Sequence, residues 1–281
     1  MIIRLSQSKD RHGLIQLWNE AFGDSVESIE FFLNNRFIPQ NTVVAEENGK
    51  IVSMLYLLSG EIAINEKSYK AYYLYAAATL KTHRGRGIMA EMLAFANKTA
   101  KDRNVDLICL KPATRELYEY YGKFGYKTVF STKTVKINVD ILQSDSNLNI
   151  EKYNNYCFAR EKTLNNFAGF IWDKKAIDFA VEFHKFFDGS VFENRNGFCL
   201  YSQNNGVCYV KEFCFTPSFL LSTLRKIIDI ETKVIKVDLP VEYPIDADNY
   251  EIKPNGMAYA ISEKAAEIYD FSDLYLNLTL D

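Results

Sequence analysis

The sequence predicts an α/β (α+β) protein made of two domains. Its 281 residues exceed the roughly 100–200 of an ordinary single domain. Strand and helix patterns follow one another through residue 140, in the order ααβββαβαβ. A strand, Asn-Gly, strand pattern from the first half of the chain also returns in the second half. Together these observations favour two related domains that each combine a sheet with helices.

The first element patterns are two helices and a hairpin. Residues 14–33 place apolar side chains at helical spacing on both sides of Gly23-Asp24, which predicts two short helices separated at that glycine. Asn48-Gly49 lies between the strand-forming runs TVVAEE and KIVSMLYLL. This dipeptide readily adopts the positive φ angles of a type I′ turn, so we expect a hairpin whose second strand continues to about Ile64.

An uncharged strand pattern then leads into a loop rich in glycine and arginine. Residues 71–80, AYYLYAAATL, predict a strand buried on both faces, and KTHRGRG follows at 81–87. The next segment, 88–103, has the spacing of an amphipathic helix. A buried strand in VDLICLKP, a helix in ATRELYEYYGKF and an alternating strand in GYKTVFSTKTVKINVD complete the first half.

A polar connection separates the two halves. Residues 141–156 are rich in Asn and Ser, which places the boundary near 145 and divides the chain into domains 1–145 and 146–281. In the second domain, Asn205-Gly206 lies 205 − 48 = 157 residues after the first Asn-Gly pair. A helix that begins at Thr216-Pro217 and the strand TKVIKVDLP then complete a ββαβ echo of the first half.

Composition excludes several classes of function. Lys and Arg number 33 against 36 Asp and Glu, so the net charge of −3 gives no general reason to bind nucleic acid or an anionic membrane. The apolar stretches fall short of the ~20 residues of a membrane-spanning helix, and we expect no signal peptide. The five cysteines form no C-x-x-C pair, and the three histidines are far apart in sequence. We therefore expect a cytoplasmic protein without a metal site.

The loop after the 71–80 strand has the features of an anion-binding cradle. Gly85 and Gly87 let the backbone approach a ligand, and the following helix N-terminus adds partial positive charge. Arg84 and Arg86 add charge-assisted donors worth about 1.5–3 kcal/mol each against a phosphate. The alternative is a solvated basic turn. The loop lacks the Gly-Lys-Ser/Thr ending of the P-loop, and no G-x-G-x-x-G occurs, so phosphoryl and hydride transfer lose support.

Two segments resemble the GNAT family of acetyl-CoA-dependent N-acetyltransferases. Residues 84–89, RGRGIM, resemble the family signature Arg/Gln-x-x-Gly-x-Gly/Ala, from which they depart at Met89. Residues 120–126, YYGKFGY, resemble the second signature, an aromatic residue and a tyrosine shortly before Gly-Phe. Both segments are similar to the Eis subgroup, which tolerates a large apolar residue at the position of Met89. Eis-like chains carry a second, degenerate GNAT-like domain and usually a third, sterol-carrier-like one, which we expect this chain to lack.

The resemblance implies the GNAT fold, a mixed and mostly antiparallel central sheet flanked by helices, followed by a GNAT-like second domain without a cradle for CoA. It implies acetyl-CoA as co-substrate, no metal, and a catalytic Tyr121 that protonates the departing thiolate. The cofactor-binding residues that it implies are Ala77, Ala78, Thr79, Arg84, Gly85, Arg86, Gly87, Ile88, Met89, Ala90, Thr114 and Arg115. Two of these roles have alternatives, since Thr114 is also a suitable helix N-cap and Tyr121 also suits an ordinary core position.

The function expected on this basis is acetyl transfer from acetyl-CoA to a primary amine. The alternative is a CoA-binding or interaction module without turnover. The acceptor, a small molecule or a peptide, stays unidentified, and the oligomeric state stays open, a homo-oligomer included. Glu46, Glu61 and Asp106 lie near strand ends without a spacing that would mark one of them as general base.

The last residues carry a further pattern. LYLNLTL at 274–280 alternates apolar and polar side chains, which predicts a strand tied into a sheet. In Eis-like enzymes the terminal carboxylate is the general base, so the resemblance suggests Asp281 for this role. A plain strand of the second domain is the favoured interpretation of the same residues.

Overall fold

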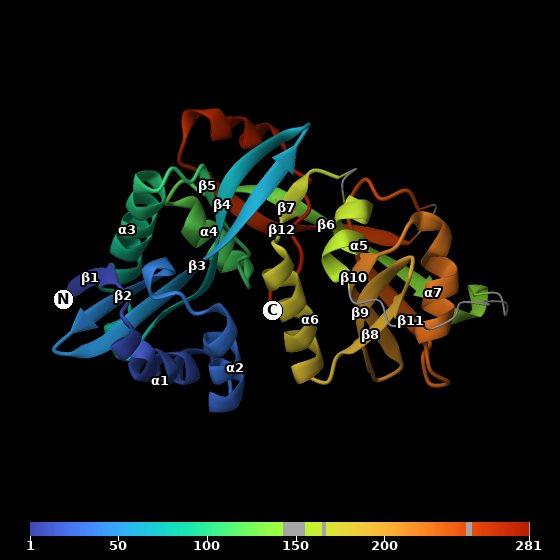
Figure 1. Cartoon of the computed structure of the whole chain (residues 1–281), viewed down its shortest axis with the longest axis horizontal. Helices are drawn as coiled ribbons and strands as arrows, with labels where there is room; N and C mark the ends of the chain where they lie inside the picture. The colour runs from blue at the N-terminus through green and yellow to red at the C-terminus, as the bar shows by residue number, and fades with distance from the viewer. Residues whose placement is uncertain (143–154, 165–166, 246–248, 281) are drawn as a thin grey trace. The chain divides into compact units, whose positions relative to one another are not determined.

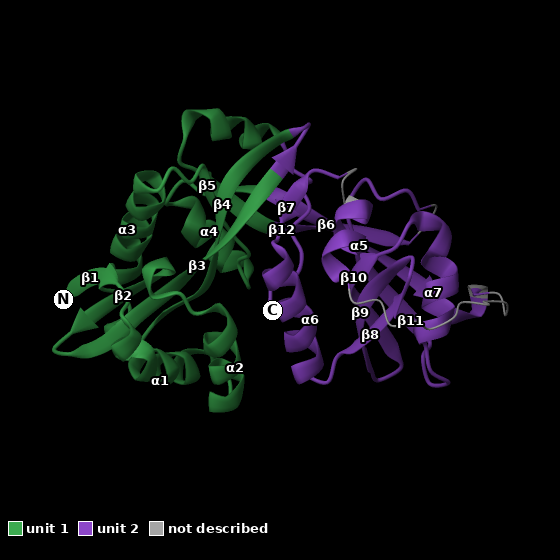
Figure 2. Cartoon of the chain, in the orientation of Figure 1, with its two compact units in different colours: residues 1–62, 67–128, 256–270 green, residues 63–66, 129–255, 271–281 purple. Residues whose placement is uncertain are grey.

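The computed structural model describes residues 1–142, 155–164, 167–245 and 249–280. The chain forms two compact units (Figure 2). The first comprises residues 1–62, 67–128 and 256–270, and the second comprises 63–66, 129–255 and 271–281. The boundary expected near 145 falls in 143–154, outside the described residues, so the division into domains 1–145 and 146–281 stays a prediction.

The first unit contains a mixed sheet with the strand order β1-β2-β3-β4-β5-β12. Its elements are β1 (Ile2–Leu5), α1 (Arg11–Phe22), α2 (Val26–Arg36), β2 (Thr42–Glu47), β3 (Lys50–Ile64), β4 (Lys67–Thr79), α3 (Ile88–Asp102), β5 (Leu107–Leu110), α4 (Arg115–Gly122) and the second half of β12 (Tyr250–Ala260). In Figure 1, α3 lies on one side of this sheet and α1 and α2 lie on the other. The predicted α/β class is confirmed.

Local sequence determines most of these boundaries. Helix α1 ends at Gly23, whose φ of +81° is the left-handed conformation that glycine adopts without steric cost. Ser25 caps α2 by accepting a hydrogen bond from the backbone N–H of Ser28. Asn48 and Gly49 both have positive φ, so the predicted hairpin forms, and β3 ends at Ile64 as expected.

Strand β1 is missing from the predicted order of elements. It has only four residues and pairs with β2 alone, at the edge of the sheet, with Ile2 opposite Glu46 and Leu5 opposite Val43. A strand this short shows no clear alternation in sequence. Three-residue 3-10 turns, Ser8–Asp10, Pro39–Asn41 and Lys81–His83, connect elements of the same unit.

The second unit repeats part of this arrangement with the strand order β12-β6-β11-β10-β9-β8. Its elements are β6 (Lys127–Asn138), α5 (Tyr156–Leu164), β7 (Gly169–Ile171), α6 (Lys174–Phe186), β8 (Ser190–Asn194), β9 (Gly197–Asn204), β10 (Val207–Cys214), α7 (Leu220–Ile227), β11 (Val234–Leu239) and the first half of β12. In Figure 1, α6 and α7 lie on opposite sides of this sheet. The predicted ββαβ segment is therefore present, as β9, β10, α7 and β11.

The internal repeat has a different register from the one expected. Strands β10 and β11 are parallel neighbours joined through α7, as β4 and β5 are joined through α3. The turn Asn205-Gly206 therefore corresponds to the β3–β4 turn at Asn65-Glu66. The sequence pattern predicts a match between Asn205-Gly206 and Asn48-Gly49, because both turns contain the same dipeptide. Asn65 and Glu66 form the equivalent turn with positive φ although they lack the Asn-Gly sequence.

The alternating strand expected at 274–280 is wrong. Leu274 and Tyr275 form isolated parallel bridges to Phe130 and Gly169, and side-chain hydrogen bonds join Leu276 to Asn255 of β12 and Asn277 to Lys211 of β10. Consecutive residues from Leu274 to Thr279 are all buried, which rules out one apolar and one polar face. Leu278 has a φ of +57°, which breaks the extended conformation. Asp281 lies outside the described residues.

Candidate functional site

The end of β4 separates from its neighbour β5. The two strands pair in parallel up to Tyr73 opposite Cys109, and the ladder ends there although β4 continues to Thr79. Beyond the last pair, Ala76 has a φ of +46°, a left-handed conformation that interrupts the regular pleat of the strand. Residues at the end of β4 therefore have backbone groups that β5 does not match.

Contacts with β3 determine which backbone groups face this gap. Ser53 Oγ donates a hydrogen bond to the Ala78 carbonyl at 2.7 Å, and the Leu80 N–H donates to a carbonyl of β3 at 2.9 Å. Alternate residues of an extended strand direct their backbone groups to opposite edges. Ala77 and Thr79 consequently direct theirs into the gap. Of the three strand residues expected to meet a ligand, Ala78 has its carbonyl bound to β3 instead.

The loop after β4 has the geometry of an open anion cradle. Gly85 and Gly87 both have a φ of +76°, and a Cβ at either position would meet nothing within 4 Å. Gly87 is the N-cap of α3 and provides no side chain to cap it. The first backbone N–H groups of a helix have no partners within the helix, which here concerns Ile88, Met89 and Ala90. These donors and the helix dipole together favour an anion.

Three side chains of the loop, those of His83, Arg84 and Arg86, are bound to neighbours within the same unit. Arg84 Nε donates to the Thr79 carbonyl at 3.0 Å, at the end of β4. Arg86 forms a two-pronged ion pair with Glu47 of β2, with Nη2–Oε1 at 2.7 Å and Nη1–Oε2 at 3.1 Å. His83 Nε2 also lies 3.1 Å from Glu47 Oε2. Arg86 and His83 therefore both contact the Glu47 carboxylate.

Thr114 and Arg115 begin helix α4. Thr114 occupies the N-cap position but caps no backbone N–H with its side chain. Its hydroxyl bonds to the carboxylate of Glu116 instead, which lowers the pKa of that carboxyl group. Arg115 is almost fully exposed and lies 4.0 Å from Glu119, one helical turn later. Thr114 thus occupies the N-cap position, as predicted, but its side chain does not make the hydrogen bond to a backbone N–H that an N-cap usually makes.

Tyr121 lies near the end of α4 and is buried. Its side chain is 8% exposed, and its ring packs edge-on against those of Tyr120 and Tyr126, with centroids at 5.4 and 5.7 Å. Burial, with a smaller contribution from Tyr120, raises the pKa of the Tyr121 phenol to about 12. The hydroxyl group is therefore protonated throughout the neutral range.

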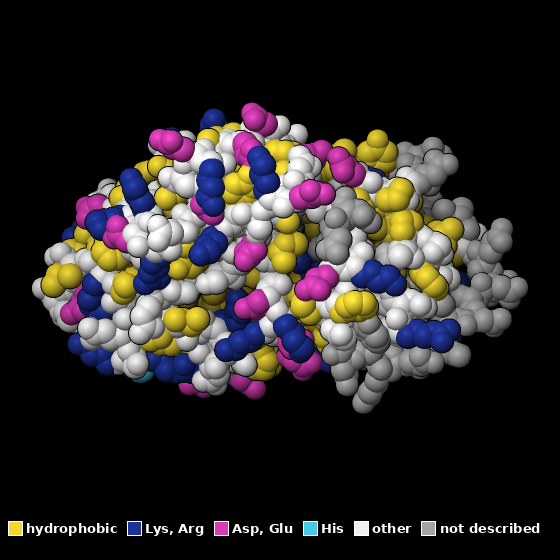
Figure 3. Space-filling model, turned by 45° about the horizontal axis from the view of Figure 1, so that its top comes forward, with side chains coloured by type: hydrophobic (Ala, Val, Ile, Leu, Met, Phe, Trp, Pro, Cys, Tyr) yellow, Lys and Arg dark blue, Asp and Glu magenta, His cyan; other side chains and the backbone are white. Residues whose placement is uncertain are grey.

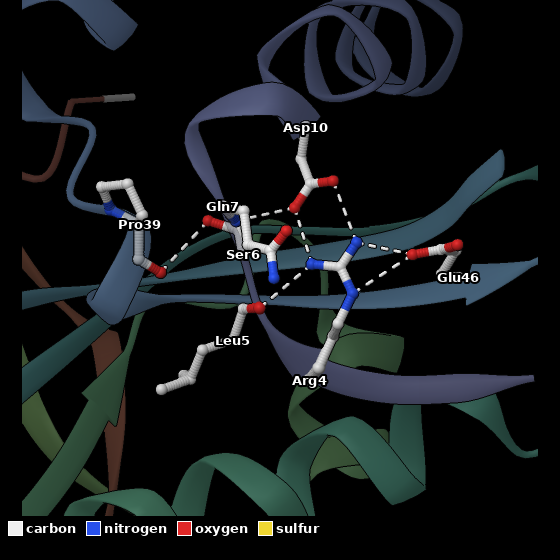
Figure 4. A network of polar contacts seen from close by, with 7 residues as sticks. All are labelled: Arg4, Leu5, Ser6, Gln7, Asp10, Pro39 and Glu46. Atoms are coloured by element: carbon white, nitrogen blue, oxygen red, sulfur yellow. Dashed lines mark hydrogen bonds and ion pairs between the residues drawn. The ribbon is translucent and has the colours of Figure 1, made fainter. Parts of the chain in front are cut away.

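Glu46, one of three carboxylates considered as a base, has a structural partner in Figure 4. The Arg4 guanidinium lies between Glu46 and Asp10, at 2.6 Å from Glu46 Oε2 and 2.7 Å from Asp10 Oδ2. Asp10 also accepts the backbone N–H of Gln7 at 2.7 Å, at the start of the first helical turn. This network joins β1 and β2 to the segment before α1.

The other two carboxylates also have partners. Asp106 accepts hydrogen bonds from Ser262 at 2.9 Å and from the Lys70 backbone N–H at 3.0 Å, and pairs with Lys264 at 3.0 Å. Glu61 accepts a hydrogen bond from Ser68 on the adjoining strand. Among the residues that the structure describes, no three His, Cys, Asp or Glu side chains gather as they would around a metal ion.

In the second unit the counterpart of the β4–β5 gap is closed. Strands β10 and β11 pair up to Val210 opposite Val237, and β10 then continues past the ladder as β4 does. Here, however, Tyr243 donates its hydroxyl hydrogen to the Phe215 carbonyl at 3.1 Å. Phe215 and Cys214 are fully buried, whereas Ala77 and Thr79 in the first unit are partly exposed.

The junction after β10 also differs from the cradle. A 3-10 turn, Pro217–Phe219, precedes α7, and Thr216 Oγ1 contacts Ser218 Oγ at 3.1 Å. The sequence has no glycine between Phe215 and Leu220. The strand, helix, strand arrangement occurs in both units. Of these two copies, the one in the first unit has both the open gap and the glycine cradle, and the one in the second unit has neither.

Both charge signs are mixed on the face of the molecule seen in Figure 3. Lys and Arg side chains alternate there with Asp and Glu, as the net charge of −3 suggests. An anionic ligand would therefore be held by the local geometry of the cradle and by no general surface field. None of the helices in the described part of the chain combines the length and apolar character that a membrane crossing requires.

Sequence reasoning overlooked Glu47 and Ala76. The signal for Glu47 was present, because it is the last residue before the Asn48-Gly49 turn and carries a charge opposite to that of the loop. Antiparallel strands β2, β3 and β4 place this hairpin end beside the end of β4. The left-handed conformation of Ala76 has no sequence signal, since alanine rarely adopts it.

Residues 2–129 match the family model of the GNAT acetyltransferase domain. This range contains β4, the cradle, α3 and α4. Residues 2–129 are a GNAT acetyltransferase domain. The two signature segments predict a GNAT domain, and this prediction is confirmed. The enzyme class of this domain is acetyltransferase. No curated protein matches the chain.

Solved structures of low sequence identity have a fold similar to that of this GNAT-containing chain. A GCN5-related N-acetyltransferase from Anabaena variabilis has a TM-score of 0.76 at 11% identity, with 94% of this chain and 74% of that chain covered. Eis1 from Mycobacterium abscessus has a TM-score of 0.69 at 12% identity, with the same coverage of 94% and 74%. A probable N-acyltransferase from Enterococcus faecalis has a TM-score of 0.73 at 12% identity, with coverage of 94% and 73%. These likenesses extend the shared fold beyond residue 129.

Proposed function

We propose that this chain is an N-acetyltransferase that transfers an acetyl group from acetyl-CoA to a primary amine of a small-molecule or peptide acceptor. The observation that supports this most is the contrast between the two units. The first has an open strand end followed by a glycine cradle, and the second has a closed strand end without a cradle. We also propose that domain 146–281 binds no CoA.

The open site fits the chemistry of acetyl-CoA. Its pantetheine arm carries amide groups, which complement the backbone groups of Ala77 and the backbone N–H of Thr79 in the gap, while the Thr79 carbonyl already accepts a hydrogen bond from Arg84 Nε. Its pyrophosphate is an anion that suits the donors of Gly87, Ile88 and the next residues at the start of α3. The open space at both cradle glycines leaves room for it. Met89 does not obstruct this role, because the contact is with its backbone.

The residues of this chain contribute in three ways to the reaction. Acetyl-CoA supplies a thioester whose carbonyl carbon a neutral amine attacks, so that the new C–N bond replaces the C–S bond. The gap at β4 holds the thioester in place for the amine, and its backbone N–H groups stabilise the negative charge that develops on the carbonyl oxygen. The amine loses one proton and the sulfur gains one.

Tyr121 is the proposed acid for the sulfur. With a pKa raised to about 12 it stays protonated at neutral pH and provides a hydroxyl hydrogen to the departing thiolate, whose conjugate thiol has a pKa near 8.5. Thr114 and Arg115, at the start of the same helix, are proposed to lie along the pantetheine. The proposal assigns no general base, since Glu46, Glu61 and Asp106 are bound to other groups.

The experiment is incubation with acetyl-CoA and a panel of amines, with release of free thiol as the readout. The panel contains an aminoglycoside, a polyamine, a peptide with a free N-terminus and a lysine derivative. Reactions without amine correct for the chain's own thiols, of which Cys157 is partly exposed. Amine-dependent thiol release together with a product heavier by one acetyl group supports the proposal.

Binding without turnover is the other outcome of interest. If calorimetry shows that CoA binds and no amine releases thiol, the chain is a CoA-binding module and the proposed reaction is wrong. Failure of CoA to bind to the folded protein contradicts the site itself.

A further inference from the structure

Glu47 connects the cradle loop to the sheet of the first unit. One carboxylate oxygen accepts Arg86 Nη2 at 2.7 Å, and the other accepts Arg86 Nη1 at 3.1 Å and lies 3.1 Å from His83 Nε2. Its two partners come from different parts of the segment, since His83 ends the 3-10 turn before the loop and Arg86 lies within it. One side chain thus restrains both parts.

The loop needs such a restraint because of its glycines. Arg86 lies between Gly85 and Gly87, and glycine loses more conformational freedom on folding than any other residue. Both glycines are exposed, with no heavy atom within 4 Å of a built Cβ, so packing does little to hold them. Binding energy that is not used to order the loop remains available for affinity.

The Glu47 carboxylate is ionised at all neutral pH values. Its pKa is lowered to about 2, chiefly by the hydrogen bond from Arg86. The Arg86 guanidinium has five N–H donors, of which Glu47 takes two. The side chain of Arg86 is 47% exposed, so its remaining donors are accessible to a ligand while the ion pair persists.

We propose that Glu47 is a positioning residue that holds the cradle loop in its binding conformation before CoA arrives. This inference rests on the proposed function for the identity of the ligand, while the restraint itself is a property of the free protein. A carboxylate close to a pyrophosphate also repels it, and this effect has the opposite sign. When Glu47 is removed, the loss of the restraint should weaken CoA binding more than the relief of that repulsion strengthens it.

The first test is amide hydrogen exchange in the free protein. In Glu47→Ala, peptides that cover residues 82–90 should exchange about three- to tenfold faster than in the wild type, and Glu47→Gln should lie between the two. Asp102→Asn is the matched control, because it breaks an ion pair with Lys98 on the same helix at a distance from the loop. Unchanged exchange in Glu47→Ala at residues 82–90 overturns the inference.

The second test is calorimetry with CoA at low and at physiological salt. We expect CoA to bind about three- to tenfold more weakly to Glu47→Ala, with the wild-type stoichiometry and with Asp102→Asn unaffected. Unchanged or tighter binding to Glu47→Ala at both salt concentrations overturns the proposal, because repulsion then equals or outweighs the restraint. If the wild type itself fails to bind CoA, the proposed function fails, and the exchange experiment still judges the restraint on its own.

Discussion

Replacement of Gly87 by Asp is the sharpest perturbation of the cradle. Gly87 has a φ of +76° and occupies the N-cap position of α3, and a Cβ at this position would meet no heavy atom within 4 Å. The substitution therefore adds backbone strain without a steric clash. It also places a carboxylate where the pyrophosphate is proposed to bind.

The loss of stability is limited by this geometry. A non-glycine residue in the left-handed region costs about 1–2 kcal/mol. For a protein of this size that corresponds to a decrease in Tm of about 2–4 °C per kcal/mol. Gly23→Asp provides the matched control, because Gly23 has a φ of +81° with equally open surroundings at the end of α1. Both variants should remain folded, and Gly87→Asp should lose no more stability than Gly23→Asp, because a carboxylate interacts favourably with a helix N-terminus and unfavourably with a helix C-terminus.

The loss of affinity for CoA should be much larger. A carboxylate at the helix N-terminus takes the place of the ligand anion and repels it, so the charge-assisted hydrogen bonds of the cradle are lost. Each is worth about 1.5–3 kcal/mol, and two of them correspond to a factor of about 10² or more in Kd. Gly23→Asp should bind CoA as the wild type does.

The assay is isothermal titration of CoA into the two variants and the wild type, after circular dichroism has shown that all three are folded. The reasoning is refuted by a folded Gly87→Asp protein whose Kd for CoA is within about twofold of the wild-type value. Equal weakening in both variants would also refute it, because the cause would then be general destabilisation.

Three further predictions concern the acid, the Figure 4 network and the closed second site. Tyr121→Phe should retain acetyl-CoA affinity while kcat falls by about 10²–10⁴-fold, and Tyr120→Phe is the control on the same helix. Equal activity of the two variants in steady-state kinetics would show that the thiolate leaves unaided. Hydrogen bonds from Arg4 lower the pKa of Asp10 in the folded protein. The contribution of Asp10 to stability is therefore complete above its pKa in the unfolded chain, about 3.9, and is lost as the pH falls through its lower pKa in the folded protein. Asp10→Asn should thus cost about 2 kcal/mol in urea unfolding at pH 7 and much less near pH 2; an equal difference at both pH values would contradict the ion-pair explanation. Tyr243→Phe leaves the buried Phe215 carbonyl without this donor and should cost about 1–3 kcal/mol, with CoA binding unchanged; weaker CoA binding would place the ligand in the second unit.

The sequence alone predicts the helices and hairpins well where local chemistry determines them. Gly23 ends a helix and Asn48-Gly49 forms a tight turn because their backbone preferences do not depend on distant residues. The cradle is predictable for the same reason, since Gly85 and Gly87 mark it and a helix pattern follows. Strand β1 was missed because four residues carry too little pattern.

The remaining features depend on contacts that are distant in sequence. The gap at β4 results from where its ladder with β5 stops, which no spacing in the sequence reveals. The pairing of Glu47 with Arg86 joins residues 39 positions apart and follows from the order of three antiparallel strands. The segment 274–279 alternates in sequence but is surrounded by protein, so its polar residues are buried as well.

The most direct test of the central claim is a crystal structure of the chain with CoA. The account predicts one CoA per chain, with the pyrophosphate against the backbone N–H groups of residues 86–90 and the pantetheine beside Ala77 and Thr79. The closed junction at residues 215–218 should remain free of ligand. CoA bound at that junction, or bound elsewhere while the β4–β5 gap stays empty, would contradict the account.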